Sequence, residues 1–127
     1  YFGGAVRTHP VGTGIADFDI VVGEGYFVRC AQAATWTVTG TPFSATSVPL
    51  NLAAGYNLVA LPLEPDPQNP YSADRAGIEA SATQVLRYVN GAFETHPVGT
   101  TVRDFALVAG QGYFVRCAAA ATWNVRR

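Results

Sequence analysis

The chain has 127 residues, of which 49% are hydrophobic and only 13% are charged, and its formal net charge is −1. A balance so close to neutral excludes the basic surface that nucleic-acid binding requires, and no apolar run approaches the ~18 residues of a membrane helix. A surface this poor in charge is typical of a protein that buries much of itself against other copies, because interspersed charges normally keep soluble molecules apart.

The first forty residues recur as the last forty. Residues 1–40 align with residues 88–127 without a gap, and 25 of the 40 positions are identical. A period of 87 residues exceeds the ~20–50 residues of common solenoid repeats. The recurrence therefore indicates a small domain that was copied whole, of which the chain holds about one and a half copies. We refer to residues 1–40 as the N-terminal copy and to residues 88–127 as the C-terminal copy.

The N-terminal copy is predicted to consist of strands. Residues 25–31 (GYFVRCA) alternate in side-chain character as a half-buried strand does, and glycines 23 and 25 mark a turn before it. The preceding run, DFDIVV, then forms a hairpin with this strand. We expect strands over residues 17–22, 25–31 and 35–39.

The middle of the chain combines strands with one helix. Two strands are predicted over 47–52 and 57–63, and their prolines place them at sheet edges or bends. The proline-rich loop at 64–70 ends the strand pattern, and Ser72 is suited to cap a short helix near 72–82.

The remaining elements follow the helix into the C-terminal copy. Asn90-Gly91 between two strand-like runs is the strongest short hairpin signal. The strands expected here cover residues 84–88, 92–96, 102–109, 112–118 and 122–125.

These elements predict a mainly β fold, an antiparallel β-sandwich or open barrel-like module with one short helix. Residues 1–46 form the C-terminal half of a first module and residues 47–127 form one complete module. The orphan half lacks the strands that its own module would supply. It either packs on the complete module to give a single pseudo-symmetric domain, or accepts strands from another chain.

The order of motifs resembles a known module. LAAGYNLVALPLEP at 52–65, a serine-containing helix, VLRYVNGAF at 85–93 and DFALVAGQGYFVR at 104–116 are similar to a tandem β-rich module, "GWNL-x-LP … GxGYWV", of bacterial secreted and cell-surface proteins. Tyr56 stands where that module has Trp, and Tyr113-Phe114 where it has Tyr-Trp. The resemblance implies an extracellular structural or adhesive role and names no catalytic residue.

The two cysteines occupy equivalent positions in the two copies. Cys30 and Cys117 can pair only if their strands lie side by side, with Cα atoms within about 7 Å. Copies related by a local two-fold axis meet this condition. The alternative, two separately buried thiols inherited by duplication, stays equally open.

Two groups of residues suggest metal ligands. Glu64, Asp66 and Asp74 crowd the proline-rich loop and helix start, where hard oxygen ligands are candidates for calcium, although a solvated loop explains them as well. His9 and His96 sit in the repeated THPVGT motif, but no further ligand lies at suitable spacing there, so we interpret the motif as a turn.

Aromatic residues suggest a core and an interface. Tyr26, Tyr113, Trp36 and Trp123 could form a platform for sugars, but their alternation in phase with valines favours core packing. The opposite face of the repeated strand carries a candidate interface made of Phe27, Arg29, Phe114 and Arg116.

No motif for catalysis, phosphate binding or a cofactor occurs, so we expect a protein that is not an enzyme and uses no cofactor. The functional hypothesis is an extracellular structural protein whose repeated modules associate with other copies into a filament, sheath or surface layer. The alternatives are a monomeric extracellular binding module for glycans or surface proteins, and an accessory domain of a larger secreted protein.

Overall fold

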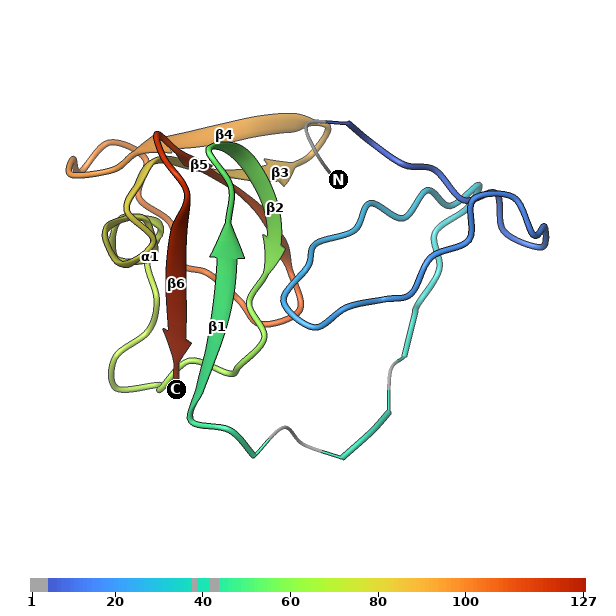
Figure 1. Ribbon diagram of the computed structural model, residues 1–127, viewed down its shortest axis with the longest axis horizontal. Coiled ribbons are helices and arrows are strands. Elements are labelled where there is room, and N and C mark those ends of the chain that lie inside the picture. Colours follow the sequence, from blue (N-terminus) through green and yellow to red (C-terminus); the bar gives the residue numbers. More distant parts are fainter. Residues whose placement is uncertain (1–4, 38, 42–43) are drawn as a thin grey trace.

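The computed structural model describes residues 5–37, 39–41 and 44–127. It is mainly β, with two antiparallel sheets and one short helix, so the prediction of a β-sandwich with a single helix is confirmed (Figure 1). The elements found among the described residues are β1 (Ser47–Leu52), β2 (Gly55–Ala60), α1 (Ala73–Glu79), β3 (Ala82–Val89), β4 (Ala92–Pro97), β5 (Gly112–Cys117) and β6 (Ala121–Arg126).

Every strand pair joins the middle of the chain to the C-terminal copy. We call residues 47–87 the central segment; it holds β1, β2 and most of β3, whereas β4, β5 and β6 belong to the C-terminal copy. One sheet pairs β1 with β6, and the other has the order β2-β5-β3-β4. Neither sheet can therefore form from the central segment alone or from the C-terminal copy alone.

Local sequence explains the turns between these elements. Asn90 and Gly91 both have positive φ, as the hairpin between β3 and β4 requires. The Ser72 hydroxyl accepts a hydrogen bond from the Arg75 N–H at 3.2 Å and so caps α1 as predicted. Pro49 lies in β1, which is an edge strand because its sheet has only two strands.

The core lies between the two sheets and α1. Its largest fully buried side chains include Trp123, Tyr71 and Tyr113. Trp123 and Tyr71 meet edge to face, with their ring centroids 5.8 Å apart. The inward face of β5 carries Tyr113, Val115 and Cys117, which are all buried, so the predicted alternation of this strand is confirmed.

The strands predicted in the N-terminal copy are wrong. No described residue before Ser47 lies in a strand, although residue 38, inside the predicted strand 35–39, lies outside the described residues. Residues 25–31 have the same sequence, GYFVRCA, as residues 112–118. The latter form β5 because β2 and β3 pair with them on both sides. Among the described residues there is no second central segment for the N-terminal copy to pair with, and an unpaired strand does not persist in water.

The strand predicted at 102–109 is also wrong. This segment turns at 102–103 and again at 109–110. Between the turns it bonds to the start of the helix instead of a sheet: the Ala73 N–H donates to the Phe105 carbonyl, and the Leu107 N–H donates to the Tyr71 carbonyl. Phe105 and Leu107 are thus buried in an irregular conformation that tertiary contacts impose, whereas Val102 and Val108 are exposed.

The N-terminal copy runs as extended loops beside the sandwich (Figure 1). Residues 23–25 touch the free edge of β2, where the Gly25 N–H donates to the Leu58 carbonyl and the Ala60 N–H donates to the Gly23 carbonyl, at 3.1 and 2.9 Å. This contact covers part of an otherwise open sheet edge. The two copies do not form a pseudo-symmetric sandwich, because only one of them contributes strands.

Candidate interaction surface

The repeated THPVGT motif folds the same way in both copies. The Nδ1 atom of His9 lies 3.0 Å from the carbonyl of Ile15, and that of His96 lies 2.8 Å from the carbonyl of Val102. In each copy the motif's last threonine donates its hydroxyl hydrogen to the carbonyl of the motif's proline at 2.8 Å. The interpretation of the motif as a turn is therefore confirmed, and the turn forms with or without neighbouring strands.

A second local structure also recurs. The Val21 N–H donates to the Tyr26 hydroxyl at 2.9 Å, and the Val108 N–H donates to the Tyr113 hydroxyl at 2.7 Å. Each tyrosine stacks on a phenylalanine eight residues earlier, with ring centroids 5.8 and 6.2 Å apart. The N-terminal copy thus already holds the two turns that precede residues 25–31, the segment equivalent to β5.

Three pairs of equivalent apolar side chains differ strongly in burial between the copies. Trp36 is 71% exposed where Trp123 is 1% exposed, and Val28 is 66% exposed where Val115 is fully buried. Ile20 shows the same difference, since it is 65% exposed and its counterpart Leu107 is 3% exposed. The C-terminal copy buries these positions against the central segment. The N-terminal copy presents them to solvent.

Exposed apolar side chains are concentrated in one part of the chain. Of the fifteen large hydrophobic residues that are exposed in the described chain, nine precede residue 38. Less than a third of the chain therefore carries most of the exposed large apolar side chains. Such a concentration marks an interaction site in soluble proteins. The nine residues are Val6, Val11, Ile15, Ile20, Val21, Val22, Phe27, Val28 and Trp36.

The two histidines differ in their partners. The buried His96 places Nε2 3.0 Å from a carboxylate oxygen of Asp74, which belongs to the central segment. Hydrogen bonds from His96, and then from the Gly99 N–H, lower the pKa of Asp74. His9 instead makes a longer contact of 3.8 Å with Asp17 in its own copy. Sequence reasoning missed the contact between Asp74 and His96, because their separation of 22 residues carries no signal.

The two cysteines are both free thiols. Cys117 is buried on the inward face of β5, and its burial raises the pKa of the thiol. Cys30 is exposed. The disulfide that the sequence left open is therefore not formed, because the copies are not placed side by side in a common sheet. The alternative of two buried thiols holds for Cys117 only.

The candidate calcium ligands do not form a metal centre in this structure. Asp74 faces His96, whereas the Asp66 carboxylate accepts a hydrogen bond from the Gln68 N–H at 2.8 Å and so shapes its own loop. Within the described ranges, no three His, Cys, Asp or Glu side chains, Glu64 included, lie close enough to hold a metal ion. The calcium hypothesis is not supported.

The outer face of the four-stranded sheet carries a cluster of aromatic rings, which we call the aromatic cluster. Phe114 on β5 contacts Tyr56 on β2 and Phe93 on β4, with centroids 6.2 and 5.7 Å apart. Tyr88 packs on Phe93 at 5.0 Å. The cluster is completed by Phe27, whose ring lies 6.0 Å from that of Phe114 and 6.2 Å from that of Tyr88.

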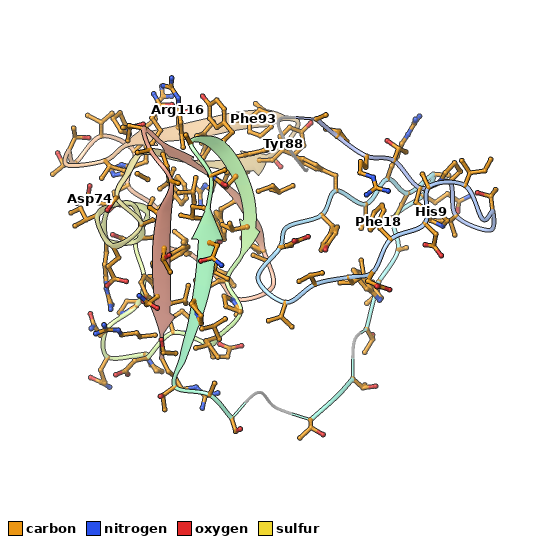
Figure 2. All side chains as sticks on the ribbon, in the orientation of Figure 1. His9, Phe18, Asp74, Tyr88, Phe93 and Arg116 are labelled. Atoms are coloured by element: carbon orange, nitrogen blue, oxygen red, sulfur yellow. The ribbon has the colours of Figure 1, made fainter. Side chains whose placement is uncertain are left out.

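The predicted interface residues fall partly in this cluster. Phe27 and Phe114 contact each other within one chain, so the repeated strand positions meet across the two copies. The guanidinium of Arg116 lies 5.6 Å from the centroid of the Tyr56 ring, and Arg29 is exposed. Figure 2 shows Tyr88, Phe93 and Arg116 at one end of the sandwich, well separated from His9 and Phe18 in the N-terminal copy.

The preference for core packing over a sugar platform is correct in one copy only. Trp123 and Tyr113 are buried, whereas Trp36 is exposed and Tyr26 is half-buried. The rings that the structure does gather at the surface, Tyr56 and Tyr88 among them, were not singled out from the sequence as a surface group. A period-two signal was available, since both lie on outward positions of their strands.

Comparisons with known proteins add no relative. No protein-family model matches the chain, and neither a curated protein nor a solved structure resembles it significantly. Within the described part of the chain, no helix is long and apolar enough to cross a membrane.

Proposed function

We propose that this chain is an extracellular structural protein that associates with other copies of itself through its N-terminal copy and so builds a filament, sheath or surface layer. The observation that carries the proposal is the burial difference between the copies: Trp36 and Val28 lie in solvent, whereas their counterparts Trp123 and Val115 form the core. Burial of such side chains contributes roughly 25 cal/mol per Å² of apolar surface removed from water.

The local structure of the N-terminal copy supports the same function. Its histidine turn and its tyrosine turn are already formed, so less conformational entropy is lost when a partner covers the apolar side chains of this copy. The low content of charged residues, 13%, also favours close approach of chains. The extracellular location rests on the resemblance of the motifs to a module of bacterial surface proteins.

The test is the size of the protein in solution. Sedimentation velocity across a hundredfold range of concentration should reveal association in the full chain, and electron microscopy should show whether the products are regular. A Val28→Asp, Trp36→Ser double variant should lose association. The matched control is Ile78→Ser, which removes an exposed apolar side chain from α1 and should leave association intact. A wild-type chain that stays monomeric throughout contradicts the proposal.

A second candidate function is recognition of glycans by the aromatic cluster. Exposed aromatic rings bury the apolar faces of sugars, and here Tyr56 and Tyr88 are exposed beside hydrogen-bonding groups of Arg116 and Gln84. Titration of the monomeric protein with soluble cell-wall oligosaccharides should then give saturable binding that Tyr88→Ala weakens. Binding that Tyr88→Ala and Tyr56→Ala both leave unchanged contradicts this function.

A further inference from the structure

The C-terminal copy shows in detail what covers a copy of this sequence. Its strand β5 lies between β2 and β3, and its strand β6 pairs with β1, so all its strand partners come from the central segment. The apolar side chains that meet it there are also from that segment, among them Leu50, Val59 and Val85. The central segment therefore supplies the strand partners and covering side chains for one copy, whereas residues 1–127 contain two copies that match it in sequence.

We propose that the N-terminal copy is an acceptor site for a second polypeptide segment with the chemistry of residues 47–87. This inference rests on the proposed function, in which the N-terminal copy is the joint, and names the partner that fits the joint. The partner supplies three strands in the pattern of β1, β2 and β3 and a short helix with an acidic residue at the place of Asp74.

Residue identities in the two copies support this fit. The strand GYFVRCA is the same in both, and the buried positions of the C-terminal copy at His96, Val115 and Trp123 carry the same residue types at His9, Val28 and Trp36. The incoming acidic residue would meet His9 as Asp74 meets His96. Cys30 would become buried as Cys117 is.

The stoichiometry of the chain decides between two sources of this segment. Residues 1–127 hold two copies and one central segment, and the C-terminal copy already uses that segment. A second identical chain can donate its segment only by uncovering its own C-terminal copy, so the exchange buries no additional core. The occupant is therefore a segment with the chemistry of residues 47–87 that does not already cover a C-terminal copy.

The bound segment must also replace an existing contact. Residues 23–25 now rest on the edge of β2 through two backbone hydrogen bonds, and in the completed module they would join the incoming segment instead. The replaced contact is small beside the side chains that would be covered, which include Ile20, Val28 and Trp36.

The test uses the full chain and a synthetic peptide of residues 47–87. Chain and peptide are mixed in urea, diluted together into buffer, and treated with a maleimide while mass spectrometry follows each cysteine. We expect a one-to-one complex in which Cys30 reacts at least tenfold more slowly than in the chain alone. If the peptide enters the C-terminal copy, the displaced central segment is free to cover Cys30, so protection is expected by either route. An unchanged Cys30 rate at a large peptide excess overturns the proposal.

Matched variants separate completion of the module from unspecific adhesion. A Val85→Asp peptide should not protect Cys30, because Val85 is fully buried in β3. A Trp36→Ser chain should lose protection, whereas an Ile78→Ser chain should keep it. Equal protection by the Val85→Asp peptide overturns the proposal.

The two proposals can fail separately. Sedimentation of the chain without peptide reports self-association, and the rate of Cys30 modification with peptide reports completion. A monomeric chain whose Cys30 the peptide protects would contradict the proposed function and support the acceptor site. If the chain self-associates but the peptide leaves Cys30 reactive, the proposed function is supported and the acceptor site is contradicted.

Discussion

The two tryptophans provide an internal comparison of the same side chain in the same short motif. Trp123 is 1% exposed, packs edge to face on Tyr71 and donates its Nε1 hydrogen to Glu79 at 3.3 Å. Trp36, in an identical Ala-Thr-Trp run, is 71% exposed. We expect Trp123→Ala to lower the free energy of unfolding far more than Trp36→Ala does.

The magnitude follows from the buried area. A buried tryptophan removes roughly 150–250 Å² from water, which at about 25 cal/mol per Å² corresponds to about 4–6 kcal/mol. This agrees with the roughly 3–5 kcal/mol lost in measured Trp→Ala substitutions in cores. Trp36→Ala should change the free energy of unfolding by no more than about 0.5 kcal/mol, as surface substitutions do.

The assay is urea unfolding followed by far-ultraviolet circular dichroism, because the substitutions remove the fluorescent probe itself. Both variants are measured at a concentration where sedimentation shows monomers, so that association does not add to stability. A loss of about 3 kcal/mol or more on Trp36→Ala would refute the reasoning. It would mean that the N-terminal copy has a packed core of its own in the isolated chain.

Three further predictions concern the contact between the copies, the pH dependence and the thiols. Gly23→Ala should release residues 23–25 from β2 and speed hydrogen exchange at the Ala60 amide, because Gly23 has a φ of +86° and a Cβ there would collide with Leu50. The control is Gly110→Ala, at a φ of +78° but with open space around the added Cβ, which should leave hydrogen exchange at the Ala60 amide unchanged. The pKa of Asp74 is lowered from 3.8, so its ionised form stabilises the fold above that value, and this stabilisation is lost as the pH falls through the lower folded-state pKa. In acid titrations of thermal unfolding, the wild type should therefore lose more stability than Asp74→Asn between about pH 4 and pH 2. Equal losses would contradict the role of the hydrogen bonds to Asp74. Cys30 should react with a maleimide more than about a thousandfold faster than Cys117, because the reagent reaches Cys117 only when the core opens. The free energy of that opening is roughly 5 kcal/mol or more in a domain of ordinary stability. Comparable rates would show that β5 opens readily.

The local sequence was sufficient for turns and caps. Asn90-Gly91 predicted the hairpin between β3 and β4, Ser72 predicted the start of α1, and THPVGT predicted a turn that both copies form. Such features depend on φ preferences and on hydrogen bonds between residues a few positions apart, so the sequence carries all the information that they need. Alternation in residues 112–118 likewise predicted which side of β5 is buried.

The candidate surface was less predictable. The sequence placed Phe27 and Phe114 on an exposed face, and the structure puts them in contact with each other. It gave no sign that Tyr88 and Phe93 join them, because cross-strand neighbours are set by register and not by distance along the chain. The contact of Asp74 with His96 was missed because it depends on how α1 packs beside β4, which the sequence does not reveal.

The sequence by itself determined that this is a mainly β protein with one short helix, and it determined the turn of the THPVGT motif, which forms in both copies. Only the tertiary structure decided that GYFVRCA is a buried strand at 112–118 and an exposed loop segment at 25–31, and that Trp123 is in the core while Trp36 is in solvent. The physical reason is that a strand needs hydrogen-bonding neighbours and an apolar side chain needs a covering surface. The described residues include one central segment to supply both, and it pairs with the C-terminal copy, to which β3 connects directly.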